Sequence, residues 1–201
     1  MKLISAVFHP LIVPTYMAFL IYKVEPTLFS PIPSEHIVPF IGAIFITTFF
    51  IPGGSIVFLK LSKRITSLEL VNRKERVIPF LFVGCFYGMS TYMFYYKLNL
   101  SSSIVSVMLI PTLLIIILSL ISLRSKISVH SASIWGACGI ICALSFHYPG
   151  FADKNILSLL FLVSGITSSS RIYLGRHTQK EMWQGATLGF FFCFIGTYFF
   201  V

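Results

Sequence analysis

Long apolar runs constrain what this chain can fold into more than any other feature of its sequence. Each of seven runs is long enough to cross a bilayer as one helix, which needs about 20 apolar residues. They predict helices at roughly 7–24, 37–59, 77–96, 103–123, 130–147, 155–172 and 183–200. Only 10% of the residues are charged, against roughly 25% in soluble proteins. The runs also do not alternate apolar and polar residues as barrel strands do. The sequence therefore predicts an all-α, polytopic transmembrane helical bundle of six to seven spans, forming one integral-membrane domain over residues 1–201.

Prolines interrupt the first two spans. Pro10 and Pro14 fall in the first, and Pro52 precedes two glycines in the second. Proline removes a backbone donor and clashes with the preceding helical turn, so we expect kinked or irregular helices there. Neighbouring helices can satisfy the backbone groups that such breaks free. The first run lacks a small-residue cleavage site, and we expect it to remain as a helix.

One charged segment, SRIYLGRHTQKEMWQG at 170–185, separates the last two apolar runs. His177 and Glu181 are four residues apart, so on a helix they share a face and the carboxylate reaches the imidazole. A carboxylate on one ring nitrogen fixes the tautomer and leaves the other nitrogen free as a nucleophile or base. Arg171 precedes His177 by six residues, and the planar fork of arginine suits phosphate. The segment therefore predicts phosphoryl chemistry.

The pattern SR-x3-G-x-H-x3-E-x3-G resembles the third signature of the type 2 phosphatidic acid phosphatase (PAP2) family. Five residues match it as they stand: Ser170, Arg171, Gly175, His177 and Gly185. Glu181 stands where the family has an aspartate. The resemblance implies a PAP2-like helical core. It also implies that His177 is the nucleophile, that Glu181 orients it, and that Ser170 and Arg171 bind phosphate.

A second segment, RSKISVHSAS at 124–133, resembles the family's Pro-Ser-Gly-His signature more loosely. Ser128 and His130 keep the serine and the histidine, Val129 replaces the glycine, and Lys126 adds a cation. The resemblance implies that His130 acts as the general acid and base, with Ser128 and Lys126 binding phosphate. Considered alone, His130 also fits a structural role.

The charged loop that ends in RKERVIP is open to two interpretations. Arg73, Lys74 and Arg76 resemble the phosphate-binding cations of the first PAP2 signature, although Pro79 does not directly follow an arginine. Presented at a helix N-terminus, they would lie where the helix dipole also favours anions. The loop equally fits a basic cytoplasmic segment that sets membrane topology.

The order of the spans predicts that these three segments meet at one membrane surface. Two spans separate each segment from the next, so the chain returns to the same face each time. Three other histidines lie at span boundaries, where we expect interfacial residues: His9, His36 and His147.

The distribution of Lys and Arg indicates which side of the membrane carries the three charged segments. Twelve of the 15 Lys and Arg residues fall on the face of the three segments: Lys2, Lys60, Lys63, Arg64, Arg73, Lys74, Arg76, Arg124, Lys126, Arg171, Arg176 and Lys180. This excess favours the cytoplasmic side. The resemblance instead implies the outer face, and phosphate binding explains several of the cations, so the side stays open. The expected location is a prokaryotic cytoplasmic membrane.

These observations predict a membrane lipid-phosphate phosphatase that hydrolyses a phosphomonoester or pyrophosphate through a phosphohistidine. One alternative is a phosphotransferase that uses the same residues to pass the group to an alcohol. Another is a transporter, scaffold or inactive relative that binds anionic lipid, to which the net charge of +9 is also suited. We expect a lipid phosphate and the bilayer as partners, and no cofactor, metal ion or nucleic acid; the oligomeric state is left open.

Overall fold

The computed structural model describes residues 1–70, 72–151 and 153–201. Every regular element in these ranges is helical, which confirms the all-α class. The α-helices, in chain order, are α1 (Lys2–Val7), α2 (Val13–Val24), α3 (Ile37–Phe45), α4 (Ile51–Leu61), α5 (Val77–Leu98), α6 (Ser102–Ser122), α7 (Val129–His147), α8 (Lys154–Tyr173) and α9 (Gln179–Phe200).

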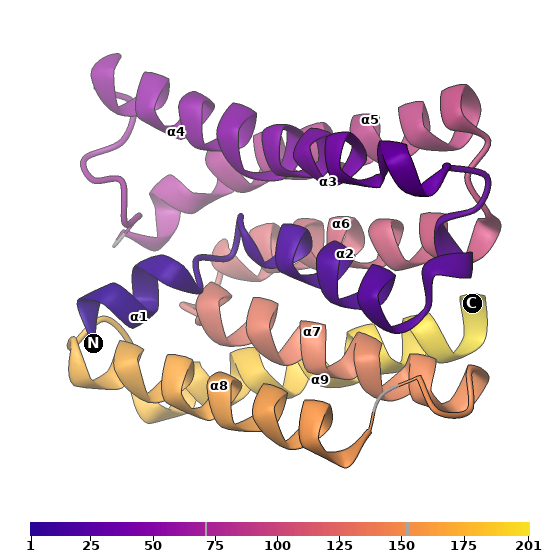
Figure 1. Ribbon diagram of the computed structural model, residues 1–201. Helices are drawn as coiled ribbons and strands as arrows, with labels where there is room; N and C mark the ends of the chain where they lie inside the picture. The colour runs from indigo at the N-terminus through magenta and orange to yellow at the C-terminus, as the bar shows by residue number, and fades with distance from the viewer. Residues whose placement is uncertain (71, 152) are drawn as a thin grey trace.

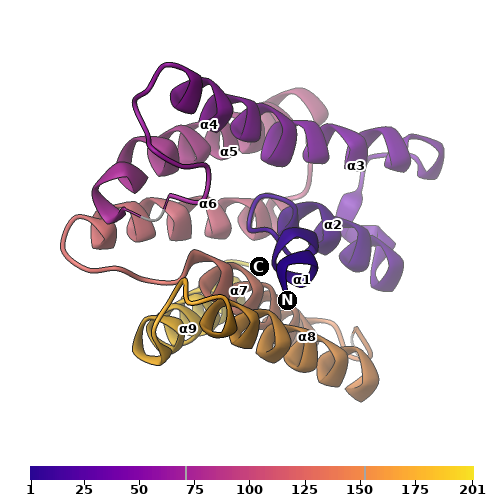
Figure 2. The same cartoon turned by 90° about the vertical axis from the view of Figure 1, so that its left-hand side faces the viewer.

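The helices form a layered bundle (Figure 1). α3, α4 and α5 make one side, α8 and α9 make the opposite side, and α2, α6 and α7 lie between them, as the second view also shows (Figure 2). α7 packs mainly on α9 and also contacts α8 and α6. The starts of α5, α7 and α9 all lie at the left-hand end of Figure 1, beside α1.

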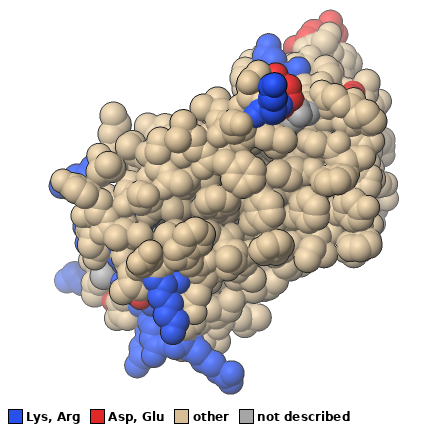
Figure 3. Space-filling model, turned by 90° about the horizontal axis from the view of Figure 1, so that it is seen from below, with Lys and Arg blue, Asp and Glu red and all other residues tan. Residues whose placement is uncertain are grey.

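Five helical stretches are long and apolar enough to cross a membrane: Ser34–Leu61, Arg73–Leu98, Ser102–Ser122, Val129–His147 and Lys154–Tyr173. They coincide with the second to sixth predicted spans. On the face seen in Figure 3, a broad surface without Lys, Arg, Asp or Glu separates charged groups at the two ends. Such a surface suits contact with lipid chains, and these features indicate an integral membrane protein.

The first predicted span, 7–24, is helical only from Val13 onward, and a separate short helix precedes it. α1 ends at Val7, α2 begins at Val13, and Pro10 lies in the turn between them. Pro14 occupies the first turn of α2, where its missing N–H costs little. The irregularity predicted here is thus a complete break, and residues 8–12 lie against the first turns of α7.

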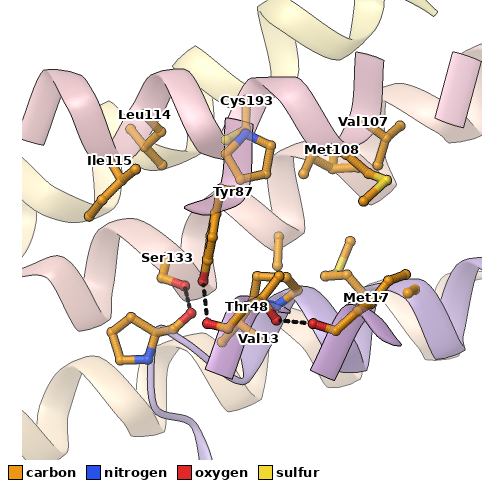
Figure 4. Close-up of a pocket in the computed structure, with 18 of the residues that line it drawn as sticks. Val13, Met17, Thr48, Tyr87, Val107, Met108, Leu114, Ile115, Ser133 and Cys193 are labelled. Atoms are coloured by element: carbon orange, nitrogen blue, oxygen red, sulfur yellow. Dashed lines mark hydrogen bonds between the residues drawn. The ribbon is translucent and has the colours of Figure 1, made fainter. Parts of the chain in front are cut away.

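The second predicted span contains a π-helical segment, Ile46–Phe50, between α3 and α4. Pro52 has no N–H, so the carbonyl of Thr48, four residues earlier, loses its helical donor. The hydroxyl of Tyr87, on α5, donates to that carbonyl at 3.2 Å (Figure 4). The irregularity predicted at Pro52 is therefore present, and a neighbouring helix satisfies the freed group.

Small residues bring α7 and α9 into backbone contact. A Cβ added at Gly189 would overlap the backbone of Ala132, and one added at Gly185 would overlap the carbonyl of Ser128. The N–H of Ser128 also donates to the carbonyl of Glu181 at 3.2 Å. The start of α7 is therefore held directly against the start of α9.

Replacing Gly189 by alanine should destabilise the protein. We expect Gly189→Ala to lower the free energy of unfolding by about 1–3 kcal/mol, the usual range for overpacking, measured by thermal unfolding in detergent. Gly165→Ala on α8 is the matched control, because nothing lies within 4 Å of its Cβ position. That variant should be neutral, or more stable by up to about 1 kcal/mol, since alanine favours helix over glycine. Equal stability of the two variants would contradict the close packing described here.

Candidate active site

A polar cavity of about 490 Å³ lies at the end of the bundle where α5, α7 and α9 begin. Its size falls within the range of small-molecule sites, about 300–1,000 Å³. Four of the residues predicted from the sequence line it: Arg76, His130, Arg171 and His177. They come from the start of α5, the first turn of α7, the end of α8 and the α8–α9 connection, so the fold brings together groups up to about a hundred residues apart in the chain.

His177 and Glu181 interact as the sequence predicts, but through a helix cap. Gly175, at φ +63°, lets the chain turn out of α8, and α9 starts only at Gln179. Thr178 is the N-cap, and its side chain and that of Glu181 form a reciprocal capping box. The Glu181 carboxylate therefore reaches back beyond the helix start, where its Oε2 accepts a hydrogen bond from His177 Nδ1 at 2.8 Å.

This contact determines the state of the imidazole. An ionised carboxylate only accepts hydrogen bonds, so Nδ1 of His177 carries the proton and Nε2 keeps its lone pair. Burial lowers the pKa of His177 to about 4; the bond to Glu181 acts in the opposite direction, and the charges of Arg76 and Lys126 add to the lowering. At neutral pH the ring is therefore uncharged, with a nucleophilic nitrogen in a polar cavity.

Two buried arginines face the same cavity without a carboxylate partner. Arg171 is 7% exposed and Arg76 is 4% exposed. Arg76 donates to the carbonyls of Leu70 and Ile127, and Arg171 donates to the hydroxyl of Ser5. Among the residues that the structure describes, neither arginine forms an ion pair, and the Nε of Arg171 has no hydrogen-bond partner. A buried cation gains from an anionic partner, so the cavity favours an anion.

The other predicted cations lie outside the cavity lining. Lys126 donates to the carbonyl of Arg176 at 2.9 Å, and its Nζ is 3.9 Å from Glu181 Oε2. Arg73 donates to the carbonyl of Arg124, and Lys74 is exposed. Of the three cations in the RKERVIP loop, only Arg76 reaches the cavity, because the short helix that contains them turns the others outward.

The hydroxyls of the two predicted serines form hydrogen bonds with nearby backbone groups. Ser128 is fully buried and caps α7, with its Oγ accepting from the N–H of Ser131 at 3.3 Å. Ser170 is also fully buried and donates to the carbonyl of Thr167 at 2.6 Å. Neither hydroxyl lines the cavity, so these serines shape the site without facing its interior.

Five polar residues of the lining were not predicted as site residues: Lys2, Ser5, His9, Glu69 and Arg176. Arg176 and Glu69 pair with each other at 2.8 Å and are partly exposed. His9 was expected only as an interfacial residue; the structure places its ring 5.3 Å from that of His130, in the lining of the same cavity. The signal available in the sequence was the His9-Pro10 pair, since a proline that ends a helix lets the preceding residue turn away from the span.

A smaller apolar cavity of about 110 Å³ adjoins the polar one (Figure 4). Val13 and Met17 of α2, Thr48, Tyr87 of α5, residues of α6 and Cys193 of α9 lie around it. Its lining shares Pro10, Leu11, Val83, Ile115 and Val129 with the polar cavity. The two cavities are therefore neighbours, with the apolar one lined mainly by α2, α5, α6 and α7.

Comparison of the chain with protein-family models, curated proteins and solved structures finds no match. Within the described residues, no group of three or more His, Cys, Asp or Glu side chains is placed to hold a metal ion. A metal-independent reaction stays a prediction.

The lowered pKa of His177 predicts how stability changes with pH. Above about pH 6.5 the ring is neutral in both the folded and the unfolded chain. As the pH falls toward 4, only the unfolded chain takes up the proton, so this residue makes the folded state progressively less stable. We expect a loss on the order of 2–3 kcal/mol by pH 4 that is absent in His177→Asn, in which an amide N–H replaces Nδ1–H. Thermal unfolding between pH 4 and 8 measures it, with the exposed His36→Asn as control; identical pH profiles for wild type and His177→Asn would contradict the neutral imidazole.

Proposed function

We propose that this protein is a divergent member of the PAP2 superfamily that hydrolyses a lipid phosphate monoester or pyrophosphate in a prokaryotic cytoplasmic membrane. The observation that carries the proposal is the His177–Glu181 hydrogen bond. It leaves Nε2 free in a cavity that His130 and Arg171 also line. The proposed fold is a bundle of six to seven spans around a PAP2-like core, in which the broken first span and α9 add to the five long apolar helices.

Two features favour phosphate as the group that binds. Arg171 and Arg76 are buried cations without carboxylate partners in the described chain, and guanidinium donates parallel hydrogen bonds to phosphoryl oxygens. Charge on those oxygens is stabilised most strongly where water is excluded. Glu69 already pairs with Arg176, so Arg171 and Arg76 are the cations proposed to hold the phosphoryl group.

The first step is the transfer of the phosphoryl group to the protein. The lone pair of His177 Nε2 attacks phosphorus, and the bond from phosphorus to the leaving oxygen breaks. His130, which a phosphate dianion beside it favours in the protonated form, gives its proton to that oxygen. Glu181 accepts the Nδ1 hydrogen bond throughout and stabilises the positive charge on the phosphorylated ring.

The second step is hydrolysis of the phosphohistidine. Neutral His130 takes a proton from a water molecule as the water oxygen attacks phosphorus. The bond between phosphorus and Nε2 breaks, its electron pair returns to His177, and inorganic phosphate leaves. His130 is protonated again and ready for the next substrate.

A lipid is the proposed substrate because of where the cavity lies. The bundle has the surface of a membrane protein (Figure 3), the polar cavity lies at one end of it, and an apolar cavity (Figure 4) shares five lining residues with the polar one. A phosphate head group would meet Arg171 and His177 while the first part of an apolar chain lies beside Leu11 and Val83. Area buried there favours a lipid over a soluble phosphate ester.

The direct test is phosphate release by the purified protein in detergent with EDTA present. We expect release from a panel of diacylglycerol phosphate and polyprenyl pyrophosphate substrates, and a loss of at least about 10³-fold in His177→Asn, since the nucleophile is removed. His36→Asn, a substitution at an exposed histidine outside the cavity, should leave the rate unchanged. Equal rates in wild type and His177→Asn would remove His177 from the mechanism. No release by a folded wild type would favour lipid binding or transfer to an alcohol.

The two-step mechanism predicts a trapped intermediate in a second variant. With an aryl phosphate, whose phenolate leaves without a proton, His130 is needed only in the second step. His130→Asn should therefore accumulate phosphorylated protein that survives alkali and is lost in acid, as expected for a phosphohistidine. Labelling with radioactive phosphate measures it. Labelled protein that also forms when His177 is replaced would contradict the proposed attachment site.

A further inference from the structure

Residues 2–11 form one wall of the polar cavity, although they lie outside all three PAP2-like segments. Lys2, Ser5 and His9 line the cavity together with His130 and Arg171. This arrangement depends on the break at Pro10, which separates α1 from α2 and turns the chain across the start of α7 (Figure 2). The carbonyl of Pro10 also lies 3.5 Å from the hydroxyl of a serine on α7.

Ser5 and His9 each contact a residue of the proposed mechanism. The hydroxyl of Ser5 accepts a hydrogen bond from the guanidinium of Arg171. The ring of His9 lies edge to face with that of His130, with centroids 5.3 Å apart and planes at 86°. These contacts place His9 beside the groups that would surround a bound phosphoryl group.

One hydrogen bond determines which ring nitrogen of His9 carries the proton and can donate it to a hydrogen bond. The backbone N–H of Leu11 donates to Nδ1 at 3.3 Å, within the turn that follows α1. Because Nδ1 accepts, it carries no proton, and the proton of the neutral ring is on Nε2. Nε2 is on the other side of the ring from the turn, and His9 lines the cavity, so Nε2–H is the donor that we infer His9 offers to a bound group.

We propose that His9 is a phosphate-binding residue of this site, whose Nε2–H donates a hydrogen bond to an oxygen of the phosphoryl group held by Arg171. The inference rests on the proposed phosphate chemistry of the same cavity. A neutral donor suits this position because the lining already contains four Lys and Arg side chains: Lys2, Arg76, Arg171 and Arg176. A further cation would add repulsion among them in the unliganded protein, whereas an uncharged N–H adds a hydrogen bond without that penalty.

Two substitutions separate this role from a structural one. In His9→Asn, the side-chain carbonyl takes the place of Nδ1 and accepts from the N–H two residues on, as in an Asx turn, but no group replaces Nε2–H. In His9→Gln, the longer side chain carries an amide N–H close to the position of Nε2. The first variant keeps the turn and loses the donor, and the second restores the donor.

The measurement is the affinity for inorganic phosphate, from the rise in Tm of the full-length protein in detergent as phosphate is added. We expect His9→Asn to weaken binding about 3- to 10-fold, the effect of one neutral hydrogen bond. His9→Gln should remain within about 2-fold of wild type, and the exposed His36→Asn should match wild type. In the phosphatase assay, His9→Asn should raise KM by a similar factor.

Each result decides between the two proposals. Unchanged phosphate affinity in His9→Asn, or equal weakening in His9→Asn and His9→Gln, would overturn the role of His9. Phosphate binding that His9→Asn weakens, in a wild type that hydrolyses no lipid phosphate, would overturn the phosphatase proposal and support that of His9. A wild type whose Tm does not change with inorganic phosphate would overturn the role of His9, and release of phosphate from lipid by the same protein would leave the phosphatase proposal standing.

Discussion

Backbone contact between α7 and α9 sets the geometry on which the candidate active site depends. Gly185 lets α9 approach so closely that a side chain there would overlap the carbonyl of Ser128, and the N–H of Ser128 donates to the carbonyl of Glu181. His130 follows Ser128 along α7, and His177 is bonded to Glu181, so this one contact places both histidines at one cavity. In a bilayer, small residues that allow close van der Waals packing are a main source of helix association.

The site combines a neutral imidazole with buried cations, and one cause underlies both. The helix ends around the cavity exclude most water from His177, Arg76 and Arg171. Exclusion of water lowers the pKa of the histidine, so that its ring is uncharged at neutral pH, the form that the proposed mechanism requires. The same surroundings keep water from screening the charges of the two arginines, which strengthens their attraction for an anion. In the proposed function, reactivity and anion affinity would both come from groups whose burial costs folding stability.

In the N-terminal residues, a break before α2 brings polar side chains into the lining of the cavity. A continuous first span would keep residues 8–12 on a helix among its neighbours. Pro10 instead ends that helix, and the chain passes over the start of α7, where Ser5 meets Arg171 and His9 meets His130. The second span also contains a proline, but there Tyr87 satisfies the freed carbonyl and the helix continues. Whether the helix ends or continues at a proline therefore depends on the neighbouring groups that can bond the freed carbonyl.

The sequence by itself determined the all-helical class, because apolar runs of bilayer length leave few other options for the backbone. It also determined that the starts of α5, α7 and α9 share one end, since two crossings separate each from the next. The contact between His177 and Glu181 was also predicted, although the structure forms it through the cap of α9 and not along one helix face. Only the tertiary structure decided which polar groups enter the cavity. Arg76 does while Arg73 and Lys74 do not, and His9 does because the turn at Pro10 lies against α7. Side-chain direction at a helix end depends on the local turn and on the neighbouring helices, and these are contacts between residues far apart in the chain.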